Sequence, residues 1–150
     1  MYEEIFAGYN QDPKDVLGTF FETDNKEMVV IQDIDFYSTC EHHGVSFFGK
    51  VHIGYIPNGR VLGLSKFARL VEIFARRLQI QEQMTEQIAD ALDKYLEPHG
   101  VIVVVEGQHL CMMMRGVQKL NSTTKTSAVR GSFKEQPEMR DEFFNILKLK

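Results

Sequence analysis

The sequence lacks tryptophan altogether and contains only two cysteines among its 150 residues. No apolar run approaches the ~20 residues that a membrane-spanning helix requires. The N-terminus, MYEEIFAGYN, has neither a basic segment nor an apolar core, so it does not resemble a secretory signal. With two thiols and no such signal, we expect a reducing compartment, the cytoplasm, where cysteines serve as ligands or nucleophiles more often than as disulfides.

Internal repeats, low-complexity tracts and linkers rich in Pro, Gly or Ser are absent from the sequence as well. We therefore expect a single domain over residues 1–150. Hydrophobic residues make up 43% and charged residues 25% of the chain, which are ordinary values for a globular protein. The net charge of −4 argues against bulk electrostatic binding to nucleic acid, although local basic patches remain compatible with it.

The hydrophobic pattern predicts an α+β fold, because strands come first, two helices follow, and further strands come after them. Ser65 is the candidate N-cap of the first helix, and Leu78 is the last of its regularly spaced apolar residues. The predicted elements are a helical and then irregular segment at 1–27, strands at 28–36 and 47–56, helices at about 65–78 and 81–96, a buried strand from 101 through 109 into 114, a strand near 128–133, and a helix at about 137–147.

Both cysteines lie in short clusters that also contain histidine. Cys40 and His43 are separated by two residues, so a tight loop can direct both side chains to one ion, and Cys111 lies at the end of the buried strand. Thiolate and imidazole are ligands that zinc favours, and three protein ligands would leave a fourth position for water, as in a catalytic site. The competing interpretations are ordinary buried thiols and a disulfide between Cys40 and Cys111.

Two further histidines flank these candidate ligands. His42 directly precedes His43, and His109 is two residues before Cys111, so the side chains of His109 and Cys111 point to the same face of a strand. Because histidine titrates near neutral pH, either His42 or His109 can carry a proton beside the metal. Arg115 adds a positive charge a few residues further on.

Polar residues also gather at the start of each predicted helix. Ser65, Lys66 and Arg69 lie where backbone N–H groups attract anions, although a solvated basic face is the simpler interpretation. Gln81 and Glu82 begin the second helix. A carboxylate there can pair with the neighbouring N–H donors of a planar base such as guanine, or it can simply be an acid favoured by the helix dipole.

Taken in order, these motifs closely resemble those of the GTP cyclohydrolase I family, zinc enzymes that start pterin and folate synthesis. The resemblance covers the family's catalytic domain, from about Tyr2 to the C-terminus. The matching segments are STCEHH (38–43), GKVHIGYIPNG (49–59), GLSKFARLVEIFARRLQIQEQMTEQIA (63–89) and VVVEGQHLCMMMRGVQK (103–119). Several long motifs in the right order make the match specific.

The resemblance implies a role for each candidate residue. Cys40, His43 and Cys111 match the family's zinc ligands, and His42 and His109 match histidines that move protons at the imidazole ring of the purine. The implied substrate contacts are Gln81 and Glu82 at the guanine edge, Ser65 near the ribose, and Lys66, Arg69 and Arg115 at the triphosphate, with Ser65 and Gln81 also among the catalytic residues.

The resemblance also implies a reaction and an assembly. The reaction is hydrolysis of GTP at C8, release of formate and rearrangement to 7,8-dihydroneopterin triphosphate. The fold is the tunnelling fold, an antiparallel sheet with a helix pair packed on one face. Family members join such sheets into rings, typically decamers of two pentamers, with active sites at subunit interfaces and no nucleic-acid or membrane partner.

Family chains normally carry a helical N-terminal extension, in which an Arg and a Lys just before the segment resembling residues 2–6 help bind the triphosphate. This chain starts at that segment, so we expect a catalytic domain without those two cations. Two other functions stay open from the sequence. One is a different reaction of the same fold in deazapurine or pterin metabolism, which the presence of all three candidate ligands disfavours. The other is a catalytically inactive module that binds zinc and purine, which His42 and His109 argue against.

Overall fold

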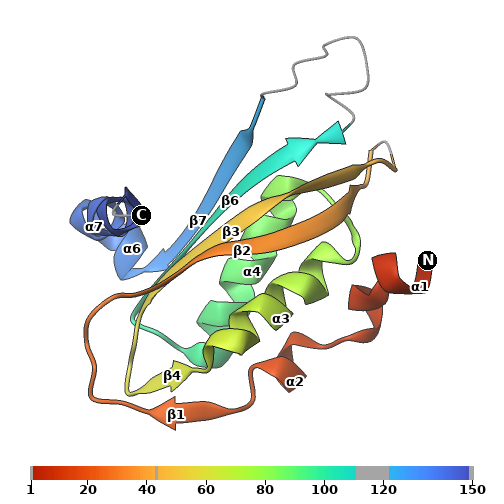
Figure 1. The fold of residues 1–150 in the computed structure, drawn as a ribbon. Helices are drawn as coiled ribbons and strands as arrows, with labels where there is room; N and C mark the ends of the chain where they lie inside the picture. Colours follow the sequence, from red (N-terminus) through yellow and green to blue (C-terminus); the bar gives the residue numbers. More distant parts are fainter. Residues whose placement is uncertain (1, 43, 111–121, 149–150) are drawn as a thin grey trace.

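The computed structural model describes residues 2–42, 44–110 and 122–148, which form a five-stranded sheet, a small two-stranded sheet and the helices around them (Figure 1). In chain order the elements are α1 (Tyr2–Ile5), the 3₁₀ helix η1 (Ala7–Asn10), α2 (Pro13–Val16), β1 (Phe20–Glu22), β2 (Val29–Cys40), β3 (Ser46–Ile56), β4 (Arg60–Leu62), α3 (Leu64–Ala75), β5 (Leu78–Gln79), α4 (Gln81–Leu96), β6 (Gly100–His109), β7 (Thr124–Gly131), α6 (Ser132–Glu135) and α7 (Pro137–Lys148).

The large sheet has the strand order β5-β2-β3-β6-β7. Its neighbouring strands are antiparallel except for β2 and β5, which pair in parallel where Cys40 lies opposite Gln79. A bulge interrupts β2 between Ile31 and Ile34. The end of β2, the start of β3 and the end of β6 meet at one end of the sheet, which we call the Cys40 end.

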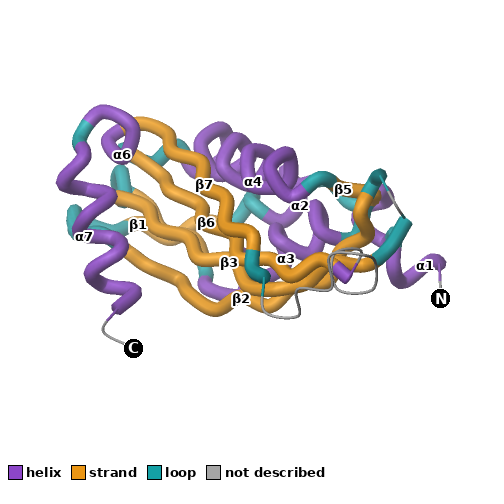
Figure 2. The backbone as a smooth tube through the Cα atoms, turned by 90° about the horizontal axis from the view of Figure 1, so that it is seen from above, coloured by secondary structure: helices purple, strands orange, loops and turns teal. Residues whose placement is uncertain are grey.

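Helices α3 and α4 pack against one face of the large sheet (Figures 1 and 2). Their apolar side chains recur at helical spacing, and they meet every second side chain of β3 and β6, because alternate strand residues point to the same face. The fully buried members of this core include Phe67, Leu70, Met84, Ile88, Val51, Ile53, Val103 and Val105. The expected α+β fold with a helix pair on one face is confirmed.

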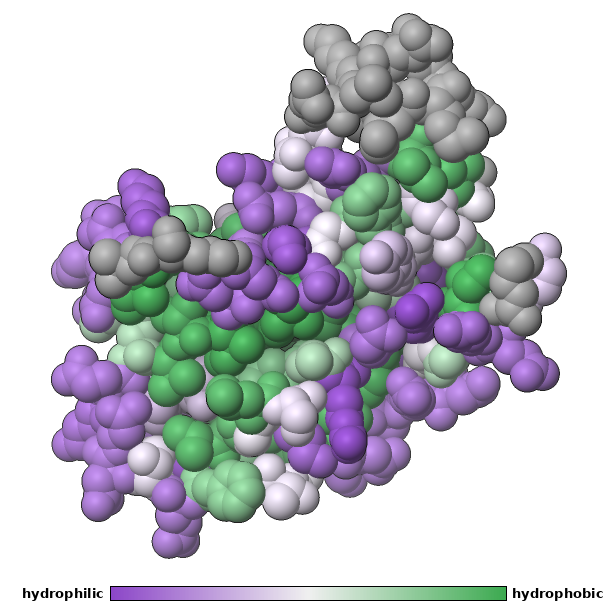
Figure 3. Space-filling view, in the orientation of Figure 1, coloured by the Kyte–Doolittle hydropathy of each residue, from purple (hydrophilic) through white to green (hydrophobic). Residues whose placement is uncertain are grey.

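The opposite face of the sheet is covered by α6 and α7 at the end far from Cys40 (Figure 2). Phe133 and Phe143 from these helices are fully buried against Ile102 and Val104 of β6. In the space-filling view, apolar side chains gather over the part of the sheet beside α7 (Figure 3). Both faces of the sheet are therefore packed at this end.

The N-terminal segment is tied to the end of α3 by Arg77. Its guanidinium donates hydrogen bonds to the carbonyl oxygens of Gly8 (3.0 Å) and Gln11 (3.3 Å), and it lies over the ring of Tyr9. The hydroxyl of Tyr9 in turn accepts a hydrogen bond from the backbone N–H of Leu78 at 2.9 Å. Because Leu78 begins β5, these contacts join the N-terminal segment to the strand that pairs with the end of β2.

The first long helix differs in two ways from the sequence-based expectation. Ser65 is not its N-cap: Gly63 occupies that position, and Ser65 lies in the first turn. Leu78 does not belong to the helix, because α3 ends at Ala75 and Leu78 pairs with β2 as part of β5. The described residues include no helix that is both long enough and apolar enough to cross a membrane.

The strands also differ in their limits. β7 spans Thr124–Gly131 rather than 128–133, because the polar residues at its start pair with β6. The sequence did not predict β1 and β4, which pair only with each other. The helices expected at 81–96 and 137–147 are confirmed within one residue.

Candidate functional site

Three of the predicted site segments meet at the Cys40 end of the sheet. β2 ends at Cys40, β6 ends at His109, and α4 begins with Gln81 directly after β5. Phe47, near the start of β3, is the register partner of His109, so β6 reaches as far as the β2–β3 loop. The predicted metal ligand Cys40, the predicted proton carrier His109 and the predicted base contact Gln81 therefore lie at the same end of the sheet, where β2 and β6 end (Figure 1).

Backbone hydrogen bonds hold the loop between β2 and β3. The N–H of Cys40 donates to the carbonyl of Val45, and the N–H of Gly44 donates to the carbonyl of Cys40, both at 2.8 Å. Gly44 has a φ of 65°, which glycine adopts without steric cost. A third bond, also 2.8 Å long, joins the N–H of Glu41 to the carbonyl of Gln79 in β5. The loop is tight, as the sequence-based prediction of Cys40 and His43 as ligands to one ion requires.

The structure places one of the three predicted zinc ligands. Cys40 is buried, whereas the neighbouring His42 is exposed. His43 and Cys111 lie outside the described residues. Within the described ranges, no three His, Cys, Asp or Glu side chains are grouped so that they could hold a metal ion. A buried thiol at the start of a tight loop fits the donor chemistry of zinc, and the full ligand set stays a prediction.

His109 is held in place at the end of β6. Its ring stacks on that of Phe47, with centroids 4.6 Å apart and planes 2° apart. Its Nε2 lies 2.8 Å from Oε1 of Gln81. Burial lowers the pKa of His109, and the carboxylate of Glu82 partly opposes this change. Both causes are local, and the first favours the neutral imidazole.

Gln81 uses its side chain within the protein. Only 1% of its surface is exposed. Its Nε2 donates to the carbonyl oxygens of Val105 (3.2 Å) and Thr124 (2.9 Å) and to the hydroxyl of Thr126 (3.2 Å). The resemblance implied that Gln81 and its exposed neighbour Glu82 contact the guanine edge. The hydrogen bonds from Gln81 to β6 and β7 were not predicted from the sequence.

The residues of α3 that were predicted to contact the ribose and the triphosphate lie towards the start of that helix. Ser65 and Lys66 are in the first turn of α3, and Arg69 is one turn further along. The Cys40 end lies beyond the last turn of the same helix (Figure 1). β5 follows that turn and pairs with the end of β2. A helix of 12 residues is about 18 Å long. One chain therefore does not bring Ser65 and Lys66 to Cys40, and Arg115 lies outside the described residues.

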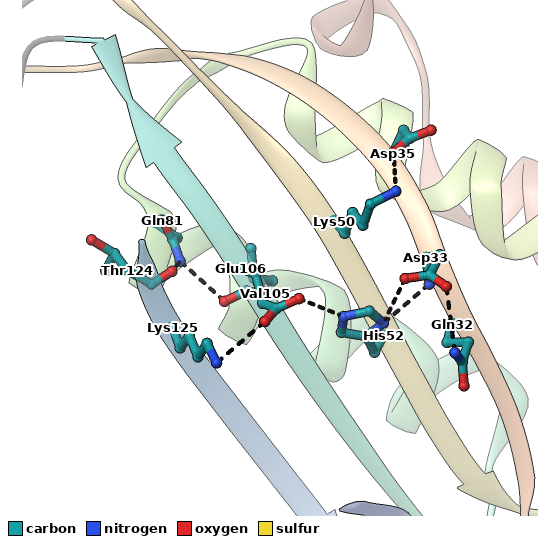
Figure 4. Close-up of polar contacts among 10 residues, drawn as sticks. All are labelled: Gln32, Asp33, Asp35, Lys50, His52, Gln81, Val105, Glu106, Thr124 and Lys125. Carbon is teal, nitrogen blue, oxygen red and sulfur yellow. Dashed lines mark hydrogen bonds and ion pairs between the residues drawn. The ribbon is translucent and has the colours of Figure 1, made fainter. Parts of the chain in front are cut away.

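A chain of polar contacts that the sequence did not predict crosses the face of the sheet opposite α3 and α4 (Figure 4). The N–H of Asp33, at the bulge of β2, donates to Nδ1 of His52 at 3.0 Å. Nε2 of His52 therefore carries the hydrogen that binds Oε2 of Glu106 at 2.9 Å. Lys125 lies 3.4 Å from the other carboxylate oxygen of Glu106. The contacts connect β2, β3, β6 and β7. Asp33, the first residue of this row of contacts, has a positive φ of 64°.

We expect this network to make the stability of the protein sensitive to acid. The hydrogen bond from His52 lowers the pKa of Glu106 from its ordinary value of 4.5. A lowered folded-state pKa contributes stability above the unfolded value, and that contribution is lost as pH falls through the folded value. We expect Glu106→Gln to lower the free energy of unfolding by about 1 kcal/mol near pH 7. The difference from wild type should shrink below about pH 4.5.

Urea unfolding at a fixed protein concentration, repeated from pH 7 to pH 3, measures this effect. The exposed Glu135, changed to Gln, is the matched control, because it removes one carboxylate outside the network. A difference between wild type and Glu106→Gln that stays constant over this range would show that the Glu106 carboxylate makes no such contribution.

The architecture is that of the tunnelling fold. It matches the crystal structure of an archaeosine synthase QueF-like protein in the apo form with a TM-score of 0.58, over 69% of this chain and 93% of that one. The two sequences are 19% identical, so this likeness concerns the fold alone.

Sequence comparison assigns the family within that fold. The GTP cyclohydrolase I family model matches residues 1–148. Proteins named GTP cyclohydrolase 1 from Campylobacter lari, Halalkalibacterium halodurans and Thermobifida fusca are each 58% identical to this chain, over 147, 149 and 148 residues. The matches cover 97%, 99% and 97% of this chain and 77%, 79% and 72% of the relatives. The chain belongs to the GTP cyclohydrolase I family, a family of hydrolases.

Proposed function

We propose that this protein hydrolyses GTP at C8 of the imidazole ring, releases formate and forms 7,8-dihydroneopterin triphosphate. The observation that carries the proposal is 58% identity over nearly the whole chain to proteins named GTP cyclohydrolase 1. The arrangement of Cys40, His109 and Gln81 at one end of the sheet supports it, because this chemistry needs a metal ligand and a proton carrier together.

Cys40, His43 and Cys111 would hold one zinc ion, since two thiolates and an imidazole are a favoured set and leave one position open. Zinc bound there would supply a coordinated water that is acidic enough to react near neutral pH. A ligand set with two thiolates needs reduced cysteines, which is consistent with a cytoplasmic protein.

The chain's own residues would bind the base and move protons. His42 is exposed beside the proposed ligand His43, so its imidazole can donate a proton to N7 of the purine while water attacks C8. His109 would exchange a second proton during ring opening. Glu82 is exposed in the first turn of α4, where its carboxylate can accept hydrogen bonds from N1–H and the 2-amino group of guanine.

The contacts of Ser65 and Lys66, at the start of α3, would come from a second copy of the chain. Ser65 would lie near the ribose, and Lys66, Arg69 and Arg115 would bind the triphosphate as cations. Because Ser65 and Lys66 lie about one helix length from the Cys40 end, the start of α3 of one copy must meet the Cys40 end of another. This requirement supports a homo-oligomer with interfacial sites, which we propose is a decamer of two pentameric rings.

The rival functions make different demands on the chain. A related reaction of the same fold that uses a nucleophilic cysteine would need Cys40 without a zinc ion. An inactive purine-binding module would need neither His42 nor His109. The position of the His109 ring, stacked on Phe47 and bonded to Gln81, favours a catalytic use of this histidine.

Incubation of the zinc-loaded protein with GTP tests the proposal. We expect about one zinc ion per chain, release of formate, and a product that becomes a fluorescent pterin on oxidation. Metal-loaded protein that binds GTP without producing formate would contradict the enzymatic function. It would favour the rival function, an inactive module that binds zinc and purine. Formate release that persists after complete removal of zinc would contradict the proposed role of the metal.

A further inference from the structure

We propose that Gln81 is a positioning residue whose amide fixes His109 in the tautomer with hydrogen on Nε2 and a lone pair on Nδ1. The tautomer follows from hydrogen bonds within the protein, and its effect on turnover rests on the proposed function. This role differs from the contact with the guanine edge that the family resemblance implies for Gln81.

The surroundings of Gln81 decide which way its amide faces. Nε2 lies 3.2 Å from the carbonyl oxygen of Val105 and 2.9 Å from that of Thr124, and a carbonyl oxygen can only accept a hydrogen bond. A flipped amide would place Oε1 against both carbonyl oxygens and leave its N–H groups toward His109. Two acceptors therefore fix Nε2 on the side of β6 and β7, and Oε1 faces His109.

His109 must then be the donor in its bond to Gln81. Oε1 of Gln81 is an acceptor, and it lies 2.8 Å from Nε2 of His109. A neutral imidazole carries one hydrogen, so this bond places it on Nε2 and leaves the lone pair on Nδ1. Stacking on Phe47 holds the plane of the ring. Nδ1 is consequently the ring nitrogen that carries the lone pair.

The fold leaves a fitted space for this amide. A Cβ added to Gly107 would lie 2.3 Å from Oε1 of Gln81, closer than a real Cβ comes to another atom. On the helix side, the hydroxyl of Thr85 donates to the backbone carbonyl of Gln81 and pairs with the hydroxyl of Thr126, each at 2.8 Å. Gly107 leaves space for the amide, and the hydroxyl of Thr126, which accepts from Nε2 at 3.2 Å, helps to fix where the amide lies.

The two roles for Gln81 have different kinetic signatures. If its amide bound guanine, losing it would weaken ground-state binding and raise KM. If its amide positions His109, losing it impairs proton transfer, so kcat falls while KM stays nearly unchanged. A substitution that displaces the amide without removing it separates these roles further, because Gly107 belongs to no predicted substrate contact.

Two variants and one control test the proposal on the intact, zinc-loaded protein. Gln81→Met keeps the side-chain length and removes both hydrogen-bonding groups, and Gly107→Ala keeps the amide but pushes it aside. Gln83→Met changes an exposed glutamine on the same helix. The tautomer of His109 is read from ¹⁵N NMR of histidine-labelled protein, assigned with His109→Asn. Zinc content and circular dichroism check that each variant is folded.

We expect the Nε2–H tautomer in wild type and in Gln83→Met, and a mixture of tautomers in Gln81→Met and Gly107→Ala. With GTP, kcat should fall about 10- to 100-fold in the last two variants at nearly constant KM. An Nδ1–H tautomer in wild type, or a tautomer unchanged in both variants, would overturn the proposal. So would a raised KM at constant kcat in Gln81→Met.

Failure of the positioning role and failure of the proposed function give different results. The NMR measurement uses no substrate, so it decides the tautomer even if wild-type protein releases no formate. Normal formate release by wild type with an unaltered His109 tautomer in both variants would leave the enzymatic function intact and remove Gln81 from proton transfer.

Discussion

Replacing His42 with alanine is expected to lower formate release from GTP by about 10²- to 10⁴-fold, the usual contribution of a general acid. The zinc content should stay at the wild-type level, because the proposed ligands are Cys40, His43 and Cys111. His42 is exposed in the loop after β2, so its removal leaves the packing of the sheet intact. Steady-state formate assays and metal analysis of the same preparation measure both quantities.

Cys40→Ala is the matched comparison from the same loop. It should lose both zinc and turnover, because a tetrahedral site with three protein ligands is weakened strongly when one thiolate is removed. Loss of zinc from His42→Ala would make His42 a ligand rather than a proton donor. Full zinc retention by Cys40→Ala would remove Cys40 from the ligand set.

Mixing two inactive chains is expected to restore activity. His42→Ala damages the Cys40 end, and the double variant Lys66→Ala/Arg69→Ala damages the start of α3. If each site combines the Cys40 end of one copy with the start of α3 of another, random assembly of equal amounts leaves both halves intact in about a quarter of the sites. Co-expression of the two chains should therefore give about a quarter of wild-type formate release.

The control for this experiment is a mixture of the two variants purified separately and kept from exchanging subunits, which should show only the low activity of each. A co-expressed sample that is no more active than this mixture would mean that each site uses one chain, contrary to the proposed assembly. Sedimentation of the co-expressed sample checks that the chains form one population of oligomers.

Local patterns in the sequence predicted that the long helices and strands exist, and they predicted the limits of α4 and α7 within one residue. The apolar spacing from Gln81 onward and the breakers Pro98 and Gly100 correctly delimit α4. The short strands β1, β4 and β5 could not be predicted in the same way, because two or three residues carry no period and become a strand only through a partner. Leu78 shows this clearly, since its spacing fits α3 but its backbone pairs with β2.

Only part of the site could be predicted, because some of its contacts join segments that are far apart in the sequence. Cys40, His42 and His109 were recognised from their residue types, their spacing and the resemblance, all of which can be read along the chain. The partners of Gln81 lie on α4, β6 and β7, and the contact between His52 and Glu106 joins β3 to β6. Both depend on which strands are neighbours in the sheet, and contacts between segments far apart in the chain decide this pairing.

The pairing of β3 with β6 has a consequence for the order of folding. The β2–β3 hairpin forms from residues that are close in the sequence. His109 of β6 contacts Phe47 of β3 only after the segment between these two strands, which includes α3 and α4, has formed a closed loop. Closing such a long segment is slow relative to forming a hairpin. The loop after Cys40 can therefore form before the end of β6 pairs with β3. A ligand that binds both the loop and the end of β6 stabilises the folded state and not the intermediates that precede it.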